Sequence, residues 1–193
     1  RVTRIDLGDN NLIGDLSAAY AAAPSDTAFS ELRSLILPVN GLTGELPTQI
    51  FGHSKLEELV LYGNQMTGDI TGQFDKLPNL TALNLGGNRV TGSIRSALES
   101  LMGQLLDLTL WSTELDADFL DLVIGDGTLL YLDLGEFGYE GDITAELAQM
   151  TQLEILGLRN NHFTGNLEGV LDGMTNLRTL LLEGNRFTGQ ILG

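Results

Sequence analysis

Apolar residues recur along the chain in a short alternating pattern, and the pattern itself returns at a nearly fixed interval. In the motif L-x-L the two leucines stand two residues apart, so both point to one side of a strand. Successive copies are separated by 30, 24, 24, 25, 24, 24 and 24 residues. The sequence therefore predicts eight copies of one unit, each with a short strand that buries its leucines. The last strand leucines are Leu7, Leu37, Leu61, Leu85, Leu110, Leu134, Leu158 and Leu182.

A polar turn pattern follows most of these strands. An asparagine three residues after the strand leucine is expected to turn inward and to hydrogen-bond the backbone of neighbouring turns. The segment T-G-x-I/L comes next, as in TGEL at 43–46, TGDI at 67–70 and TGSI at 91–94. We call the asparagines the asparagine ladder: Asn10, Asn40, Asn64, Asn88, Asn161 and Asn185.

The combined pattern L-x-x-L-x-L-x-x-N-x-L-x-G-x-I resembles the leucine-rich repeat family over essentially the whole chain. Its T-G extension is similar to the plant-type subclass of secreted and receptor-like proteins. The resemblance implies an α/β solenoid: a curved, right-handed stack of about eight 24-residue repeats, with a parallel concave sheet and 3₁₀ or loop segments on the convex side. One repeat cannot bury its apolar face alone, so residues 1–193 are expected to form a single domain. Because the terminal caps of such solenoids are absent, the sequence is expected to be a segment of a longer protein.

The pattern is defective in the fifth and sixth copies. Thr113 and Phe137 replace the ladder asparagine, Ala117 takes the place of the turn glycine, and Glu140 replaces the usual threonine. Threonine offers one hydroxyl and phenylalanine offers no polar group, so the backbone there needs other partners. Two interpretations remain open: repeat drift with local repacking, or an altered curvature that shapes a binding surface.

Charge and composition restrict the partners. The chain has 10 Lys and Arg against 26 Asp and Glu, a net charge of −16, which disfavours nucleic acid and anionic membranes and favours basic partners or cations. It has no apolar run of 18 residues, so no membrane span is expected in this segment. The sequon Asn79-Leu80-Thr81 predicts an N-linked glycan on Asn79 and supports an extracellular or cell-surface location.

The sequence offers nothing that favours an enzyme. His53 and His162 are more than four repeats apart and there is no cysteine, so a catalytic triad cannot converge. Phosphate-binding, dinucleotide, zinc-protease and EF-hand motifs are absent as well. We therefore expect no catalytic residues, no metal site and no cofactor.

Function in the resembling family is usually located on the concave strands, so the exposed columns of those strands supply the candidates. Trp111, the only tryptophan, is expected outside the core as an aromatic anchor, with Gly86 leaving a gap between it and Tyr62. Alternatively, Trp111 folds over a neighbouring strand. Acidic residues surround the patch, namely Glu58, Asp107, Asp133 and Glu136. The predicted ligand-binding residues are Ile36, Val60, Tyr62, Asn84, Asp107, Thr109, Trp111, Tyr131, Asp133 and Ile155.

Two classes of function remain at this stage. The first is a recognition module that binds a protein or peptide ligand carrying apolar groups and positive charge. The second is a structural component of an extracellular matrix or filament that assembles end to end or laterally. An ice-binding role is suggested by a threonine column on the convex side, but Asp116 and Glu140 interrupt it. The column is Thr43, Thr67, Thr91, Thr164 and Thr188.

Overall fold

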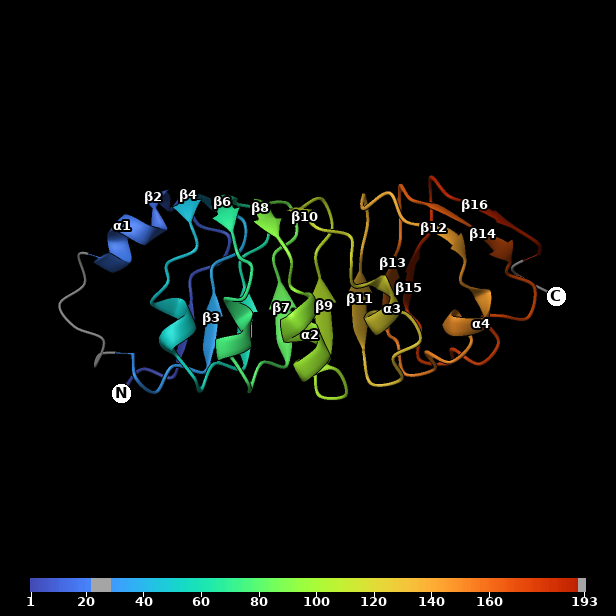
Figure 1. Ribbon diagram of the computed structural model, residues 1–193, viewed down its shortest axis with the longest axis horizontal. Helices are drawn as coiled ribbons and strands as arrows, with labels where there is room; N and C mark the ends of the chain where they lie inside the picture. Colours follow the sequence, from blue (N-terminus) through green and yellow to red (C-terminus); the bar gives the residue numbers. More distant parts are fainter. Residues whose placement is uncertain (22–28, 191–193) are drawn as a thin grey trace.

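The computed structural model describes residues 1–21 and 29–190 and forms an elongated stack (Figure 1). Eight parallel strands run in chain order along one side, and neighbouring strands pair residue for residue, with Leu59 beside Leu83. The predicted leucine-rich repeat solenoid with a parallel sheet is confirmed. The strands are β1 Arg4–Asp6, β3 Ser34–Ile36, β5 Glu58–Val60, β7 Ala82–Asn84, β9 Asp107–Thr109, β11 Tyr131–Asp133, β13 Ile155–Gly157 and β15 Thr179–Leu181.

The T-G segments form further strands that the sequence analysis did not predict. One parallel sheet holds five of them: β2 Ile13–Asp15, β4 Gly41–Glu45, β6 Gln65–Asp69, β8 Arg89–Gly92 and β10 Glu114–Leu115. A separate sheet holds three: β12 Glu140–Asp142, β14 His162–Asn166 and β16 Arg186–Thr188. Within the described ranges no ladder joins β10 to β12, and Figure 1 shows the two groups of arrows apart.

Within the part of the chain that the structure describes, six short helices complete most repeats on the other side of the stack. Two are 3₁₀-helices, η1 Ile50–Gly52 and η2 Phe74–Lys76. Four are α-helices: α1 Leu16–Ala21, α2 Arg95–Leu101, α3 Leu120–Val123 and α4 Thr144–Leu147. The convex side is therefore more α-helical than the predicted 3₁₀ and loop segments.

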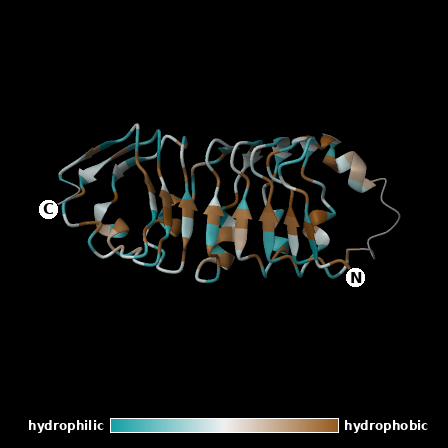
Figure 2. Cartoon of the chain, turned by 180° about the vertical axis from the view of Figure 1, so that it is seen from behind, coloured by the Kyte–Doolittle hydropathy of each residue, from teal (hydrophilic) through white to brown (hydrophobic). Residues whose placement is uncertain are grey.

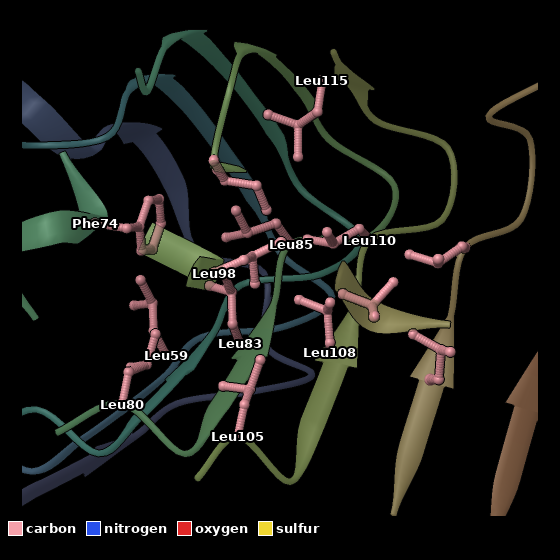
Figure 3. Packing of buried hydrophobic residues seen from close by; sticks show 14 of the residues in the cluster. Leu59, Phe74, Leu80, Leu83, Leu85, Leu98, Leu105, Leu108, Leu110 and Leu115 are labelled. Atoms are coloured by element: carbon pink, nitrogen blue, oxygen red, sulfur yellow. The ribbon is translucent and has the colours of Figure 1, made fainter. Parts of the chain in front are cut away.

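The strand leucines fill a continuous core between the concave sheet and these helices. Leu83 and Leu108 point into it from β7 and β9, and Leu98 of α2 meets them from the opposite side (Figure 3). Figure 2 shows the strands side by side, with hydrophobic and hydrophilic stretches within single strands. Leu7 of the first repeat differs from the other strand leucines. It is 46% exposed, because no preceding repeat of the described chain packs on it.

Asn64, Asn88 and Asn161 of the asparagine ladder lie buried inside the turns as predicted, whereas Asn10 of the first repeat is exposed. Asn64 Nδ2 donates to the carbonyls of Leu37 and Leu61, both at 2.9 Å, while its Oδ1 accepts from the Leu42 N–H at 3.1 Å. Asn88 and Asn161 repeat this arrangement one or more units along. Each amide thus satisfies buried backbone of two adjacent repeats, which joins the repeats along the stack.

The two defective repeats replace ladder bonds by other contacts. The Thr113 hydroxyl donates to the Leu110 carbonyl at 2.9 Å, which is one of the bonds that an asparagine would make. Phe137 instead packs its ring edge-on to Phe119 at 5.6 Å and stacks on Tyr139 at 5.3 Å. An apolar ring contact therefore takes the place of a polar ladder position in the sixth repeat.

Candidate functional site

Most of the predicted ligand-binding residues line one hollow of about 340 Å³ on the concave sheet. We call it the concave hollow. Its residues come from the outward-facing positions of β7, β9, β11 and β13 and from the second position after β5 and after β9. Ile36 of β3 and Val60 of β5 are half-buried and do not line it. The lining residues are Tyr62, Asn84, Asp107, Thr109, Trp111, Tyr131, Asp133 and Ile155.

Trp111 lies flat on the preceding repeat. A Cβ atom on Gly86 would come within 2.4 Å of the indole Nε1, and one on Gly87 within 2.8 Å of a ring carbon. The predicted gap between Tyr62 and Trp111 was therefore wrong, because the indole occupies the space that the glycines leave. The alternative, in which Trp111 folds over its neighbour, is what the structure shows. The half-buried ring still forms one wall of the concave hollow.

Arg159 changes the electrostatics of this surface, although it was not among the predicted ligand-binding residues. Its guanidinium lies 5.7 Å from the centre of the Trp111 ring and donates to Asp133 Oδ2 at 3.0 Å. It crosses Gly135, where a Cβ would come within 2.9 Å of the Arg159 side chain. In the sequence, Arg159 occupies the same repeat position as Trp111, two repeats later, and Gly135 occupies that position in the repeat between them. This spacing was the signal that could have identified it.

The predicted acidic surround of the site is partly neutralised. Asp133 is only 8% exposed, is paired with Arg159 and accepts the Gly135 N–H at 3.0 Å, so the prediction of an exposed carboxylate there was wrong. Glu58 forms an ion pair with Arg4 at 2.9 Å. Glu136 remains exposed beyond the strand end.

Asp107 is the carboxylate of the concave hollow for which the described residues supply no ion pair. The Thr109 hydroxyl donates to its Oδ1 at 2.7 Å. Burial raises the pKa of Asp107 to about 6, an effect that the Thr109 hydrogen bond opposes. A positively charged ligand group beside it would favour the ionised form.

The turn before β7 places Asn79 on the surface, as the sequon requires. Its Nδ2 donates to the Ser54 carbonyl at 2.7 Å, so a glycan would displace this hydrogen bond. Glycosylation stays a prediction.

Residues 1–21 and 29–190 offer neither a cluster of metal ligands nor a membrane-spanning helix. They contain no group of three or more His, Cys, Asp or Glu placed to hold a metal ion. No helix there has the length and apolar character needed to cross a bilayer.

The chain is similar to several known proteins. Residues 30–90 match the family model described as leucine rich repeat. No curated protein matches the sequence significantly. Among solved structures, the LRR ectodomain of the receptor kinase GASSHO1/SCHENGEN3 from Arabidopsis thaliana, in complex with CASPARIAN STRIP INTEGRITY FACTOR 2, is 33% identical with a TM-score of 0.69. That match covers 96% of this chain and 22% of the receptor chain.

Two further structures bear on function. The Arabidopsis receptor kinase HAESA, in complex with the peptide hormone IDA and the co-receptor SERK1, is 26% identical with a TM-score of 0.72 over 96% of this chain and 30% of its own. A plant ice-binding protein is 25% identical with a TM-score of 0.70 over 96% of this chain and 58% of its own. The chain thus spans less than a third of either receptor chain.

Proposed function

We propose that this chain, a leucine-rich repeat protein of the plant type, is a non-catalytic recognition module that binds a peptide or protein ligand in its concave hollow. Residues 1–193 act in this proposal as a single leucine-rich repeat domain of an extracellular or cell-surface protein. The observation that carries the proposal is the convergence of aromatic walls and a partly buried carboxylate on one hollow.

The walls and floor of the hollow favour a ligand with apolar groups. Tyr62, Trp111 and Tyr131 present half-buried rings, and Ile155 adds an aliphatic surface. Rigid aromatic side chains lose little conformational entropy on binding and are frequent energetic anchors of interfaces. The hollow therefore offers shape and apolar area, while its polar groups set orientation.

The charge of the hollow favours a basic group on that ligand. Arg159 already neutralises Asp133, so Asp107 supplies the negative charge that a ligand would meet. The net charge of −16 adds a long-range attraction for basic molecules. We infer a peptide with at least one Lys or Arg beside apolar residues.

The comparisons support peptide recognition rather than assembly. Both receptor structures are described as complexes with a peptide hormone or a named factor. An assembly role receives no such support from them. The likeness to an ice-binding protein gives some support to an ice-binding role for the threonine column. Asp116 and Glu140 interrupt this column, however, and no ladder joins β10 to β12 in the described residues, so the column lacks the regular spacing such a role would need.

The proposal is tested with a phage-displayed library of random nonapeptides selected on the purified protein at pH 7. Enriched peptides are synthesised, and their Kd is measured by fluorescence anisotropy against wild type, Tyr62→Ala and the control Thr188→Ala. Loss of a central aromatic anchor costs about 2 kcal/mol or more, so Tyr62→Ala should weaken binding about thirtyfold. The control, on the other sheet, should bind like wild type.

The pH dependence gives a second readout of the same proposal. Binding of a basic peptide should strengthen between pH 5 and pH 7, as Asp107 ionises, and Asp107→Asn should remove most of this dependence. Enriched peptides that bind Tyr62→Ala and Asp107→Asn with wild-type affinity would rule out the concave hollow as the recognition site.

A further inference from the structure

The strands formed by the T-G segments fall into two sheets, and the break between these sheets lies at the one repeat whose turn glycine is missing. In the other repeats this glycine has φ between +81° and +119°, for example +92° at Gly92 and +109° at Gly141. Ala117 occupies the corresponding position and does not adopt a positive φ, which its Cβ would make costly. Strand β10 accordingly ends at Leu115, and among the described residues no ladder joins it to β12.

The fifth repeat is tied to the fourth after this point. The Ser93 hydroxyl donates to Asp118 Oδ2 at 2.8 Å, and Arg95 grips both carboxylate oxygens of Asp121 at 2.7 and 2.8 Å. The Arg95 guanidinium also donates to the Asp118 carbonyl. These bonds anchor α3 to the side of α2, and among the described residues no strand pairs with β12 on its β10 side.

The edge of β12 is open to an incoming strand. In the regular repeats a Cβ on the turn glycine would collide with the preceding repeat, at 2.3 Å from Asp15 for Gly44 and 2.5 Å from Asp142 for Gly165. A Cβ on Gly141 would meet nothing within 4 Å, as for Gly14 on the outermost strand β2. All three residues of β12 are exposed. The backbone edge in mid-chain therefore resembles a terminal one.

A groove of about 640 Å³ runs along this break, which we call the seam groove. Its apolar surface includes Phe137 and Ile143, and the carboxylates of Asp118, Glu140 and Glu146 border it. For Glu140 and Glu146 the structure gives no ion pair within the described ranges. The groove thus combines an apolar floor with uncompensated negative charge.

Tyr139 points independently to a missing binding partner. Its side chain is only 7% exposed and lines the seam groove, yet its hydroxyl has no hydrogen-bond partner. Burial, followed by the nearby charges of Asp118 and Asp121, raises its pKa, so the hydroxyl stays protonated and able to donate. A buried polar group without a partner costs about 1 to 3 kcal/mol, which an arriving acceptor would recover.

We propose that the seam groove binds an extended segment of a partner protein, with alternating basic and apolar residues, as an added strand on the free edge of β12. Addition to an open edge supplies backbone hydrogen bonds, and alternate side chains then reach the groove and its rim. The bordering carboxylates select Lys or Arg, and the Tyr139 hydroxyl donates to a carbonyl of the segment. A second copy of the chain fits poorly, because each copy carries −16.

The test selects the nonapeptide library on the Tyr62→Ala variant, which lacks an anchor of the concave hollow, and then measures the Kd of the enriched peptides for wild type and for Glu140→Lys/Glu146→Lys. The control is Glu168→Lys/Glu183→Lys, which changes the net charge equally on exposed positions outside the groove. Peptides enriched by this scheme should alternate basic with apolar residues and lose at least tenfold in affinity on the seam variant only. They should retain wild-type affinity for Tyr62→Ala, which separates this site from the concave hollow.

Two more measurements test the binding mode. Hydrogen exchange should show protection of the amides at 140–142 when the selected peptide binds. Tyr139→Phe, which deletes the unpartnered hydroxyl alone, should leave the urea midpoint equal or higher and weaken the peptide about fivefold. An unchanged or higher urea midpoint together with weaker peptide binding shows that the hydroxyl contacts the ligand and does not stabilise the fold.

Three results would overturn the proposal. The first is equal binding of the enriched peptides to the seam and control variants. The second is peptide binding without protection of 140–142. The third is a wild-type dimer in sedimentation that Glu140→Lys/Glu146→Lys dissociates, since a second copy would then occupy the groove.

Discussion

Replacing Asn88 by alanine removes one complete position of the asparagine ladder. Asn88 is 3% exposed, and its amide donates to Leu61 and Leu85 at 3.0 and 2.9 Å while accepting from the Met66 N–H at 3.0 Å. A net contribution of about 1 kcal/mol per bond gives about 3 kcal/mol for the three. The buried backbone groups left behind raise this cost, and a water molecule entering the small cavity lowers it.

The matched control is Asn10→Ala, at the same repeat position in the first unit. Asn10 donates to Leu7 and Gly8 at 3.0 and 2.9 Å, but it is exposed, so water replaces it and the loss should stay below about 1 kcal/mol. Equilibrium urea unfolding followed by far-UV circular dichroism compares both variants with wild type. A difference between the two variants below about 0.5 kcal/mol would refute the reasoning that burial gives the ladder its value.

Four further predictions follow from the same structure. Burial raises the pKa of Asp107 from its unfolded value of 3.8 to about 6. The free energy of unfolding is therefore highest at low pH, where the carboxyl is protonated, and it falls as the pH rises through 6. Two pKa units bound the effect at about 3 kcal/mol, so Asp107→Asn should stabilise the fold by about 2 kcal/mol at pH 8 and by little at pH 4, measured by urea titration. Val39 has φ +53°, which is costly for a β-branched residue, so Val39→Gly should raise the unfolding free energy by about 1 kcal/mol; an unchanged urea midpoint would contradict the strain. Trp111→Ala should cost about 2 kcal/mol of stability, because the indole covers Gly86; thermal melting as in wild type would show that this packing contributes nothing. Native protein should lose the mass of a glycan at Asn79 on enzymatic deglycosylation, and an unmodified residue would remove the sequon from consideration.

The concave surface shows how far sequence reasoning reaches. A period of two within strands and about 24 between them fixed which positions face outward, and this brought residues from Tyr62 to Ile155 to one hollow. The ladder was predictable too, because buried turn backbone requires an amide at a constant place. These features depend on spacing alone, and spacing can be read from the chain.

Side-chain direction on that surface needed the folded neighbours. The Trp111 side chain could have projected away from the sheet or packed flat on the preceding repeat. It packs flat, because Gly86 and Gly87 have no Cβ atom and leave room for the indole. The charge of Asp133 is neutralised because Arg159, from the next repeat, extends across Gly135 and forms an ion pair with it. Neither outcome follows from a residue and its own repeat, because each depends on space and charge contributed by another repeat.

The break between the sheets of β10 and β12 depends on both kinds of information. The sequence marked Ala117 as a departure from the turn glycine, and the conformational preference of glycine is a local property. What followed from it was decided by the tertiary structure: β10 stops at Leu115, β12 keeps an open edge, and the Tyr139 hydroxyl is buried without a partner. The local signal, Ala117, located the defect. That the defect opens a groove could be seen only in the stacked repeats, because strand pairing depends on two repeats at once.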